Sequence, residues 1–354
     1  MTTSPETLQR PSSTMAVVQP RLPRWSPGLV AAIASALGAG AWLAGANAAL
    51  AVVLAAVLFV GGMPLWSLLV ENRRAAADRL ASGLVWTPFV IACIPLVWLV
   101  YVVLKNGLPV VNAQFLTFQM RNVIGDQQGG LYHALIGTLL ITGMATLISV
   151  PVGIFCAIYL IEYGKGRRVA RVVTFLVDVM TGIPSIVAGL FALSLFVLIL
   201  GPSVRFGFGG SVALSLLMIP TVVRSTEEML RLVPDDLREA SYALGVPKWR
   251  TIAKVVLPTA LGGIVTGVVL AISRVIGETA PLLVVAGFTD SVNMNLFSDR
   301  MMTLPVFIFT QYASSTEKGY AYAWGGALVL IAIVMVLNLI ARVIGKIFAP
   351  KTGR

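Results

Sequence analysis

RSTEEMLRLVPDDLREASYALGVPKWRTIAKVVLP, residues 224 to 258, is a charged segment set between two long apolar runs. Two acidic residues follow Pro234, and acids stabilise the N-terminal end of a helix. Gly245 can adopt the left-handed conformation that ends a helix, and Pro247 suits the first turn of a second helix, which we expect to end before Pro258. The segment therefore predicts a helix, a sharp turn and a second helix.

The sequence around this hairpin is too apolar for an ordinary soluble domain. Of its 354 residues, 57% are hydrophobic and 12% are charged, which is more apolar surface than one soluble core can bury. Residues 28–70 exceed the ~20 that cross hydrocarbon, and Gly45 to Asn47 offer a turn between two spans. Six further spans are expected at 86–104, 132–160, 183–200, 211–223 (beginning a few residues earlier), 260–287 and 322–348. We predict an all-α polytopic membrane protein with about eight transmembrane helices.

Lysine and arginine are distributed unevenly between alternate loops. Twenty of the 26 lie in five segments: residues 1–27, 71–85, 161–171, 224–258 and the C-terminus. Five lie in the other three loops: residues 105–131, 201–210 and 288–321. This positive-inside bias predicts a multi-pass protein of the cytoplasmic (inner) membrane with both termini in the cytoplasm, and it explains the net charge of +11 by contact with a lipid bilayer rather than with nucleic acid.

The chain divides into three predicted parts. Residues 1–27 are rich in Ser, Thr, Pro and Arg, a composition that favours a disordered cytoplasmic tail. Residues 28–85 form an accessory transmembrane hairpin. Residues 86–354 form the core, which includes the loop 224–258.

The loop 224–258 resembles the EAA loop of ABC importer permeases. Glu239-Ala240, a glycine six positions later and the final Leu257-Pro258 match that pattern, whereas Ser241 replaces the third alanine. In that family the loop docks on an ATP-hydrolysing subunit. The resemblance implies that the contact with an ABC ATPase dimer is made by Glu239, Ala240, Gly245, Pro247, Leu257 and Pro258. Because the chain has no Walker A phosphate loop, we expect a permease that is not itself an enzyme.

One basic residue, Arg274, falls inside a predicted span. An arginine at the bilayer centre costs roughly 2.5–3.5 kcal/mol on insertion scales, so it needs a partner or a wet cavity. Glu278 lies one helical turn later, and the two side chains are expected to share a helix face. They form either a self-neutralising ion pair or a pathway site. In the second case the guanidinium binds an oxyanion through paired hydrogen bonds. Glu278 then accepts a hydrogen bond from a protonated oxygen of the phosphate. Sulfate at neutral pH has no protonated oxygen and cannot make this bond.

The segment 273–281, SRVIGETAP, closely resembles a signature of the PstA family of phosphate ABC importer permeases. The likeness extends over residues 86–348 and also includes LYHA at 131–134, GIPSIV at 182–187 and EEML at 227–230. It implies a type I (MetI-like) core of six helices and a second homologous permease of the PstC type. It also implies inorganic phosphate as cargo and an extracytoplasmic phosphate-binding protein docking near 105–131 and 288–321. No cofactor or metal is expected.

Three further residues are candidates for the substrate pathway. Thr279 follows Glu278. Ser185 lies at a predicted helix start, where a side chain either helps free backbone N–H groups to bind an anion or serves as an ordinary helix cap. Asp178 is either interfacial, on the pathway or paired with a basic residue. An importer permease for sulfate or molybdate is the nearest alternative. An ion-coupled secondary transporter with Asp178, Arg274 and Glu278 as a proton relay is a different class, and a sensor or scaffold without flux is a third. The EAA-like loop argues against the last two.

Overall fold

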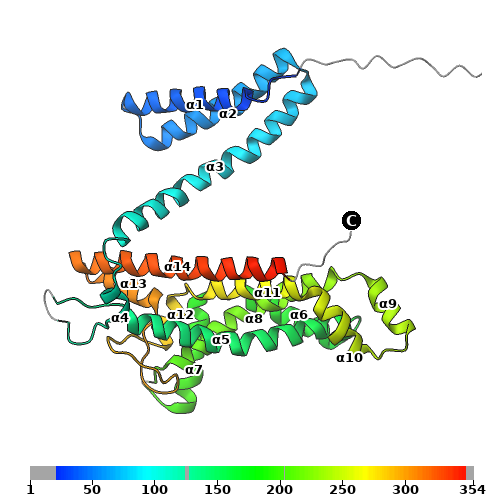
Figure 1. Cartoon of the computed structure of the whole chain (residues 1–354), viewed down its shortest axis with the longest axis vertical. Coiled ribbons are helices and arrows are strands. Elements are labelled where there is room, and N and C mark those ends of the chain that lie inside the picture. Colours follow the sequence, from blue (N-terminus) through cyan, green and yellow to red (C-terminus); the bar gives the residue numbers. More distant parts are fainter. Residues whose placement is uncertain (1–20, 124–126, 203, 348–354) are drawn as a thin grey trace, which may run out of the picture. The chain divides into compact units, whose positions relative to one another are not determined.

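The computed structural model describes residues 21–123, 127–202 and 204–347, and this part of the chain contains helices and no strand (Figure 1). The chain forms two compact units, Met1–Tyr101 and Val102–Arg354, called unit 1 and unit 2 below. Among the described residues, seven helices are long and apolar enough to cross a membrane, or eight if one bent pair counts as a span. The predicted all-α fold with about eight spans is confirmed.

Unit 1 begins with a helical hairpin, α1 (Ser26–Leu43) and α2 (Ala48–Val70). The predicted turn between them is confirmed. Gly45 takes a positive φ of 100°, and the side chain of Asn47 accepts the backbone N–H of Leu50 at 2.7 Å, as an N-cap does. A long third helix, α3 (Arg73–Gly107), follows and carries two internal prolines. Within the predicted tail, residues 1–20 lie outside the described residues, and α1 already begins at residue 26.

The connection between α2 and α3 is held by the carboxylate of Glu71. It accepts hydrogen bonds from the Arg79 guanidinium at 2.9 Å to each oxygen, from the Ser67 hydroxyl at 2.5 Å and from the backbone N–H of Leu22 at 2.8 Å. These donors, the Arg79 bonds first, lower the pKa of Glu71 from 4.5 to about 2. Because the bonds join three separate segments, they fix where α1 begins relative to α2 and α3.

Replacing Glu71 with Gln is expected to destabilise unit 1 by about 2 kcal/mol, since charge-assisted bonds become neutral ones. A lowered folded-state pKa stabilises the fold above the unfolded pKa near 4.5, and this contribution is lost as the pH falls toward 2. The difference in thermal stability between wild type and variant should therefore be constant from pH 6 to 8 and shrink below pH 4.5. Asp78→Asn, which alters an exposed carboxylate on α3, is the control. An equal effect of both variants would contradict the prediction.

Unit 2 begins with the last residues of α3, followed by short α4 (Ala113–Thr117). Long α5 (Tyr132–Ile158) comes next and ends in a π-helical turn, η1 (Tyr159–Tyr163). The next helices, α6 (Arg168–Thr181) and α7 (Ser185–Leu200), meet at 109° and form the bent pair. The predicted span 183–200 is α7, preceded by Pro184. A long α8 (Gly207–Arg231) then packs along α5, and hydroxyls of α8 bond to α5 carbonyls, as in Ser211 to Ile141 at 3.1 Å.

The second half of unit 2 contains α9 (Asp235–Ala243), α10 (Lys248–Thr251), the π-helical η2 (Ile252–Val256), α11 (Leu257–Val275), α12 (Ala280–Val285), α13 (Leu304–Ala313) and α14 (Glu317–Ile347). In Figure 1, α5, α8, α11 and α14 run alongside one another, with α9 and α10 at one end and α4 and α13 at the other. We call these the elbow end and the far end. The main core lies between α5, α8, α11, α13 and α14.

Close packing of α11 on α8 depends on two glycines. A Cβ on Gly267 would lie 2.6 Å from Ser225, and Gly263 faces Met229 in the same way. Glycines four apart let two helix backbones approach closely. Their contact is therefore internal to this chain.

Two predicted helix boundaries are wrong. The second helix of the hairpin does not end before Pro258, because α10, η2 and α11 form one continuous helix from Lys248 to Val275. The widened turn accommodates the proline, and the Leu257 N–H bonds to the Ile252 carbonyl five residues back. Conversely, the predicted span 260–287 is broken, since α11 ends at Val275 and α12 begins at Ala280.

Candidate functional site

The elbow, residues 234–257, projects from one end of unit 2 (Figure 1). Pro234 precedes α9 and Pro247 precedes α10, and Gly245 between them has a φ of +73°. The predicted helix, turn and helix are confirmed. The buried Ser241 and Thr251 hydroxyls share a hydrogen bond of 2.8 Å, which joins the two helices. Serine at the third position of the EAA pattern thus holds the hairpin closed.

Arg238 fastens the elbow to the bundle. Its guanidinium donates two hydrogen bonds to one oxygen of Glu162 in η1, at 3.1 and 3.0 Å. It also bonds to the carbonyls of Leu230 and Val233 at 2.9 and 2.7 Å and to Asp235 at 3.1 Å. The side chains of Arg238 and Glu162 are only 12% and 6% exposed. A pair this shielded is weakened little by salt and sets the orientation of α9.

A lysine adds a second attachment. The Lys248 ammonium donates to the backbone carbonyl of Glu162 and lies 4.9 Å from the centre of the Tyr163 ring. Together with Arg238, it connects both elbow helices to the same turn of η1. Movement of the elbow therefore acts directly on the end of α5.

The outer face of the elbow is open and partly apolar. Leu244 and Trp249 are 83% and 61% exposed, and three of the predicted coupling residues, Glu239, Ala240 and Gly245, are exposed beside them. Pro247 is exposed as well, whereas Leu257 and Pro258 lie at the base, where η2 joins α11. Exposed large apolar side chains on a protruding hairpin are typical of a protein interface.

The structure separates Arg274 from Glu278. Arg274 lies exposed in the last turn of α11, where the helix dipole favours a cation, and Glu278 lies beyond the helix end, in the break at residues 276–279. The expectation that they share a helix face is wrong, because the helix stops one residue after Arg274. No ion pair joins them in the described chain, and neither has another salt-bridge partner among the described residues.

The start of α7 lies against the segment that follows this break. A Cβ on Gly189 would lie 2.6 Å from the Cα of Pro281, so α7 contacts the start of α12. Ser185 is four residues before Gly189 and shares its helix face. Thr279 is the N-cap residue of α12 and makes no side-chain capping bond. Ser185 and Thr279 are thus brought toward the same region as Glu278.

Asp178 lies elsewhere, in an ion-pair network near the elbow end. It pairs with Arg224 of α8, which also bonds to the buried carboxylate of Glu227 at 2.6 Å. Of the three alternatives predicted for Asp178, the structure supports the one in which it pairs with a basic residue, here Arg224. Arg224 and Glu227 escaped sequence reasoning as a pair, although their spacing of three on one helix was a usable signal.

Two arginines at the far end also escaped the sequence analysis. Hydrogen bonds from Phe206 to the Val285 carbonyl at 3.3 Å and from Met301 to the Ala286 carbonyl at 3.1 Å join two loops to the end of α12. The side chains of Arg205 and Arg300, the residues before these donors, both reach Gly287: a Cβ there would lie 3.4 and 3.3 Å from their Cδ atoms. The aliphatic stems of two arginines thus lie against the same glycine.

The chain is similar in sequence to a known family of transport proteins. A family model described as "Binding-protein-dependent transport system inner membrane component" matches residues 149–354. Phosphate transport system permease protein PstA 1 of Mycobacterium tuberculosis H37Rv is 49% identical over 274 residues, which is 77% of this chain and 88% of that protein. PstA of Haemophilus influenzae is 38% identical over 270 residues, 76% of this chain and 94% of that protein.

Among solved structures, the MetNI methionine ABC transporter in inward facing conformations is similar at 21% identity and a TM-score of 0.48, covering 62% of this chain and 94% of that chain. The resemblance predicted from residues 273–281 and from the elbow is confirmed by the sequence relatives. The chain belongs to the family of binding-protein-dependent transport system inner membrane components and, within it, to the PstA permeases.

Proposed function

We propose that the chain is the transmembrane permease subunit of an ATP-driven importer of inorganic phosphate. The exposed elbow carries this proposal. It presents Glu239, Ala240 and Gly245 on a hairpin that is attached to the helix bundle by a shielded ion pair, as is needed in a subunit moved by a separate ATPase. The relatives named phosphate transport permeases indicate that the cargo is phosphate. Hydrolysis of ATP then belongs to a separate ABC ATPase dimer docked on the elbow.

The orientation follows from the charge distribution. The loops at the elbow end are the basic ones, and so we place the elbow and both termini in the cytoplasm. The far end then faces outward, where an extracytoplasmic phosphate-binding protein docks. Arg205 and Arg300 at that end attract acidic groups of the binding protein.

The exposed position of Arg274 supports a second permease subunit of the PstC type. A guanidinium facing lipid is costly, whereas one that faces a partner subunit across a wet path is stabilised. We propose that Arg274, Glu278, Thr279 and Ser185 line that path, with phosphate bound between the two subunits. Asp178 stays a weaker candidate, since its carboxylate is occupied by Arg224.

The test is transport by the complete complex in proteoliposomes. Phosphate delivered by its cognate binding protein should stimulate ATP hydrolysis at least ten-fold and accumulate in the lumen, and sulfate or molybdate at the same concentration should do neither. Stimulation by sulfate or molybdate instead would make this a permease for another oxyanion. Uptake that persists without ATP but collapses with the proton gradient would overturn the proposal altogether.

A further inference from the structure

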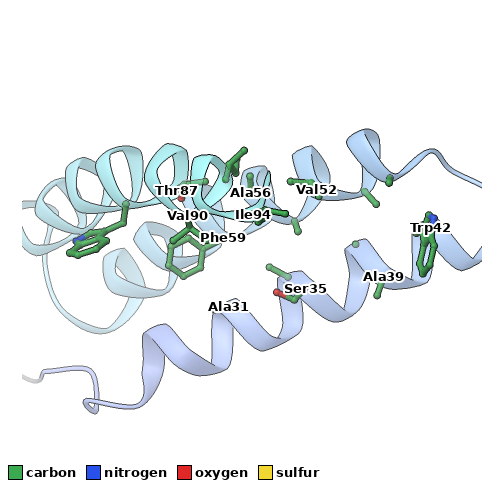
Figure 2. A pocket seen from close by; sticks show the side chains of 17 residues that line it. Ala31, Ser35, Ala39, Trp42, Val52, Ala56, Phe59, Thr87, Val90 and Ile94 are labelled. Carbon is green, nitrogen blue, oxygen red and sulfur yellow. The ribbon is translucent and has the colours of Figure 1, made fainter. Parts of the chain in front are cut away.

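Unit 1 contains an apolar groove of about 600 Å³ between its three helices (Figure 2). Small residues four apart on α1, Ala31, Ser35 and Ala39, form one side, and Phe59 of α2 and Val90 of α3 lie opposite. The groove is lined over the length of α1 from residue 31 to Trp42. Twelve residues of helix span about 18 Å, which is a little more than half of the ~30 Å hydrocarbon core of a bilayer.

A second cavity of about 830 Å³ adjoins the groove. Phe59 and Trp86 line both, so the two cavities are neighbours that share these side chains. The lining of the second cavity mixes apolar residues such as Pro27 and Met63 with polar ones from the α2–α3 connection, the start of α3 and the segment before α1. The ionisable members are Arg21, Glu71, Arg74, Asp78 and Arg79. Thus an apolar groove about half a bilayer long adjoins a cavity with charged side chains, called the polar chamber below.

The polar chamber carries an excess of positive charge. Arg79 is neutralised by Glu71, which leaves Arg21, Arg74 and the single carboxylate of Asp78. Both of these arginines are exposed, and neither forms a salt bridge with a described residue. Trp86 lines the junction between chamber and groove, and tryptophans are enriched at the level of lipid headgroups.

We propose that the groove and the chamber together bind one phospholipid with an anionic headgroup. An acyl chain lies in the groove between α1, α2 and α3, and the headgroup phosphate accepts hydrogen bonds from Arg21 and Arg74. The length of the groove matches a chain of one leaflet, and the charge of the chamber is complementary to the headgroup. The site lies wholly within unit 1 and is independent of the cargo.

The test uses the complete transporter reconstituted in phosphatidylcholine vesicles that contain a small fraction of a photoactivatable lipid. The probe is phosphatidylglycerol or phosphatidylcholine with the same diazirine-labelled acyl chain. The anionic probe should label peptides containing residues 31–42 and 86–94 at least five times more than the zwitterionic probe. The double variant Arg21→Gln/Arg74→Gln should remove this preference, and Ser35→Phe/Ala39→Phe should reduce labelling by both probes.

The matched control is Arg24→Gln/Arg73→Gln. It removes the same charge from the same two segments, at residues that do not line the chamber, and it should keep the preference. Equal labelling of the groove by the two probes in the wild type, or an unchanged preference in the Arg21/Arg74 variant, would overturn the proposal. So would a cross-link from Ala39→Cys to the second permease subunit, which would identify the occupant as a protein helix.

Discussion

Replacing Arg274 with lysine should lower phosphate uptake at least ten-fold, although the protein reaches the membrane in normal amount. Lysine keeps the charge but loses the planar fork that donates two parallel hydrogen bonds to an oxyanion. In the structure this side chain is exposed at the end of α11 and has no described carboxylate partner, so its donors are free for a ligand. Uptake of labelled phosphate in proteoliposomes, normalised to permease content, measures the effect.

Arg342→Lys is the control, since it makes the same exchange on α14 and should leave flux within two-fold of wild type. Glu278→Gln tests the other half of the site. It should lower the selectivity for phosphate over sulfate, because an amide no longer serves as a charged acceptor for a protonated phosphate oxygen. Normal flux in Arg274→Lys, or unchanged flux and selectivity in Glu278→Gln, would mean that these residues only balance charge.

Replacing Arg238 with alanine should uncouple the permease from its ATPase. The variant loses five hydrogen bonds and leaves the buried carboxylate of Glu162 without its guanidinium. Removing one member of a buried pair typically costs about 3–5 kcal/mol, enough to free α9 from η1. Stimulation of ATP hydrolysis by the phosphate-loaded binding protein should fall at least ten-fold, and proteolytic cleavage within residues 234–257 should become faster.

Arg231→Ala serves as the control, because this exposed residue at the end of α8 should tolerate truncation. Glu162→Gln/Arg238→Met removes both charges and should recover part of the stability lost in Arg238→Ala. If the single variant remains fully coupled, Arg238 is not the fastening that the structure indicates.

Hydropathy and turn chemistry were sufficient to predict most of the helices. Gly245 with Pro247 predicted the elbow correctly, because these residues fix backbone geometry locally. Pro258 led to a wrong prediction, because proline usually marks the end of a helix. In the structure the preceding turn widens to a π-helix, and this widening accommodates the proline within a continuous helix. The break after Val275 was missed because the apolar run continues across it, although Gly277 and Pro281 were available signals.

Contacts between segments that are distant in the chain could not be predicted from the sequence. Glu162 and Arg238 are 76 positions apart, and no periodicity relates them. The predicted pairing of Arg274 with Glu278 was wrong for a different reason, since here the sequence indicated a contact that the structure lacks. A spacing of four predicts a contact only where the helix continues, and α11 ends between the two residues. Arg205 and Arg300 were treated as ordinary loop charges, because their shared contact at Gly287 joins segments far apart in the sequence.

The continuous helix from Lys248 to Val275 has a mechanical consequence. Its 28 residues measure about 40 Å, with the elbow at one end and Arg274 at the other. We expect a tilt imposed on the elbow to be transmitted along this helix, through the π-helical turn at residues 252–256, to the guanidinium near its other end. One continuous helix would thus both receive movement at the elbow and change the position of Arg274.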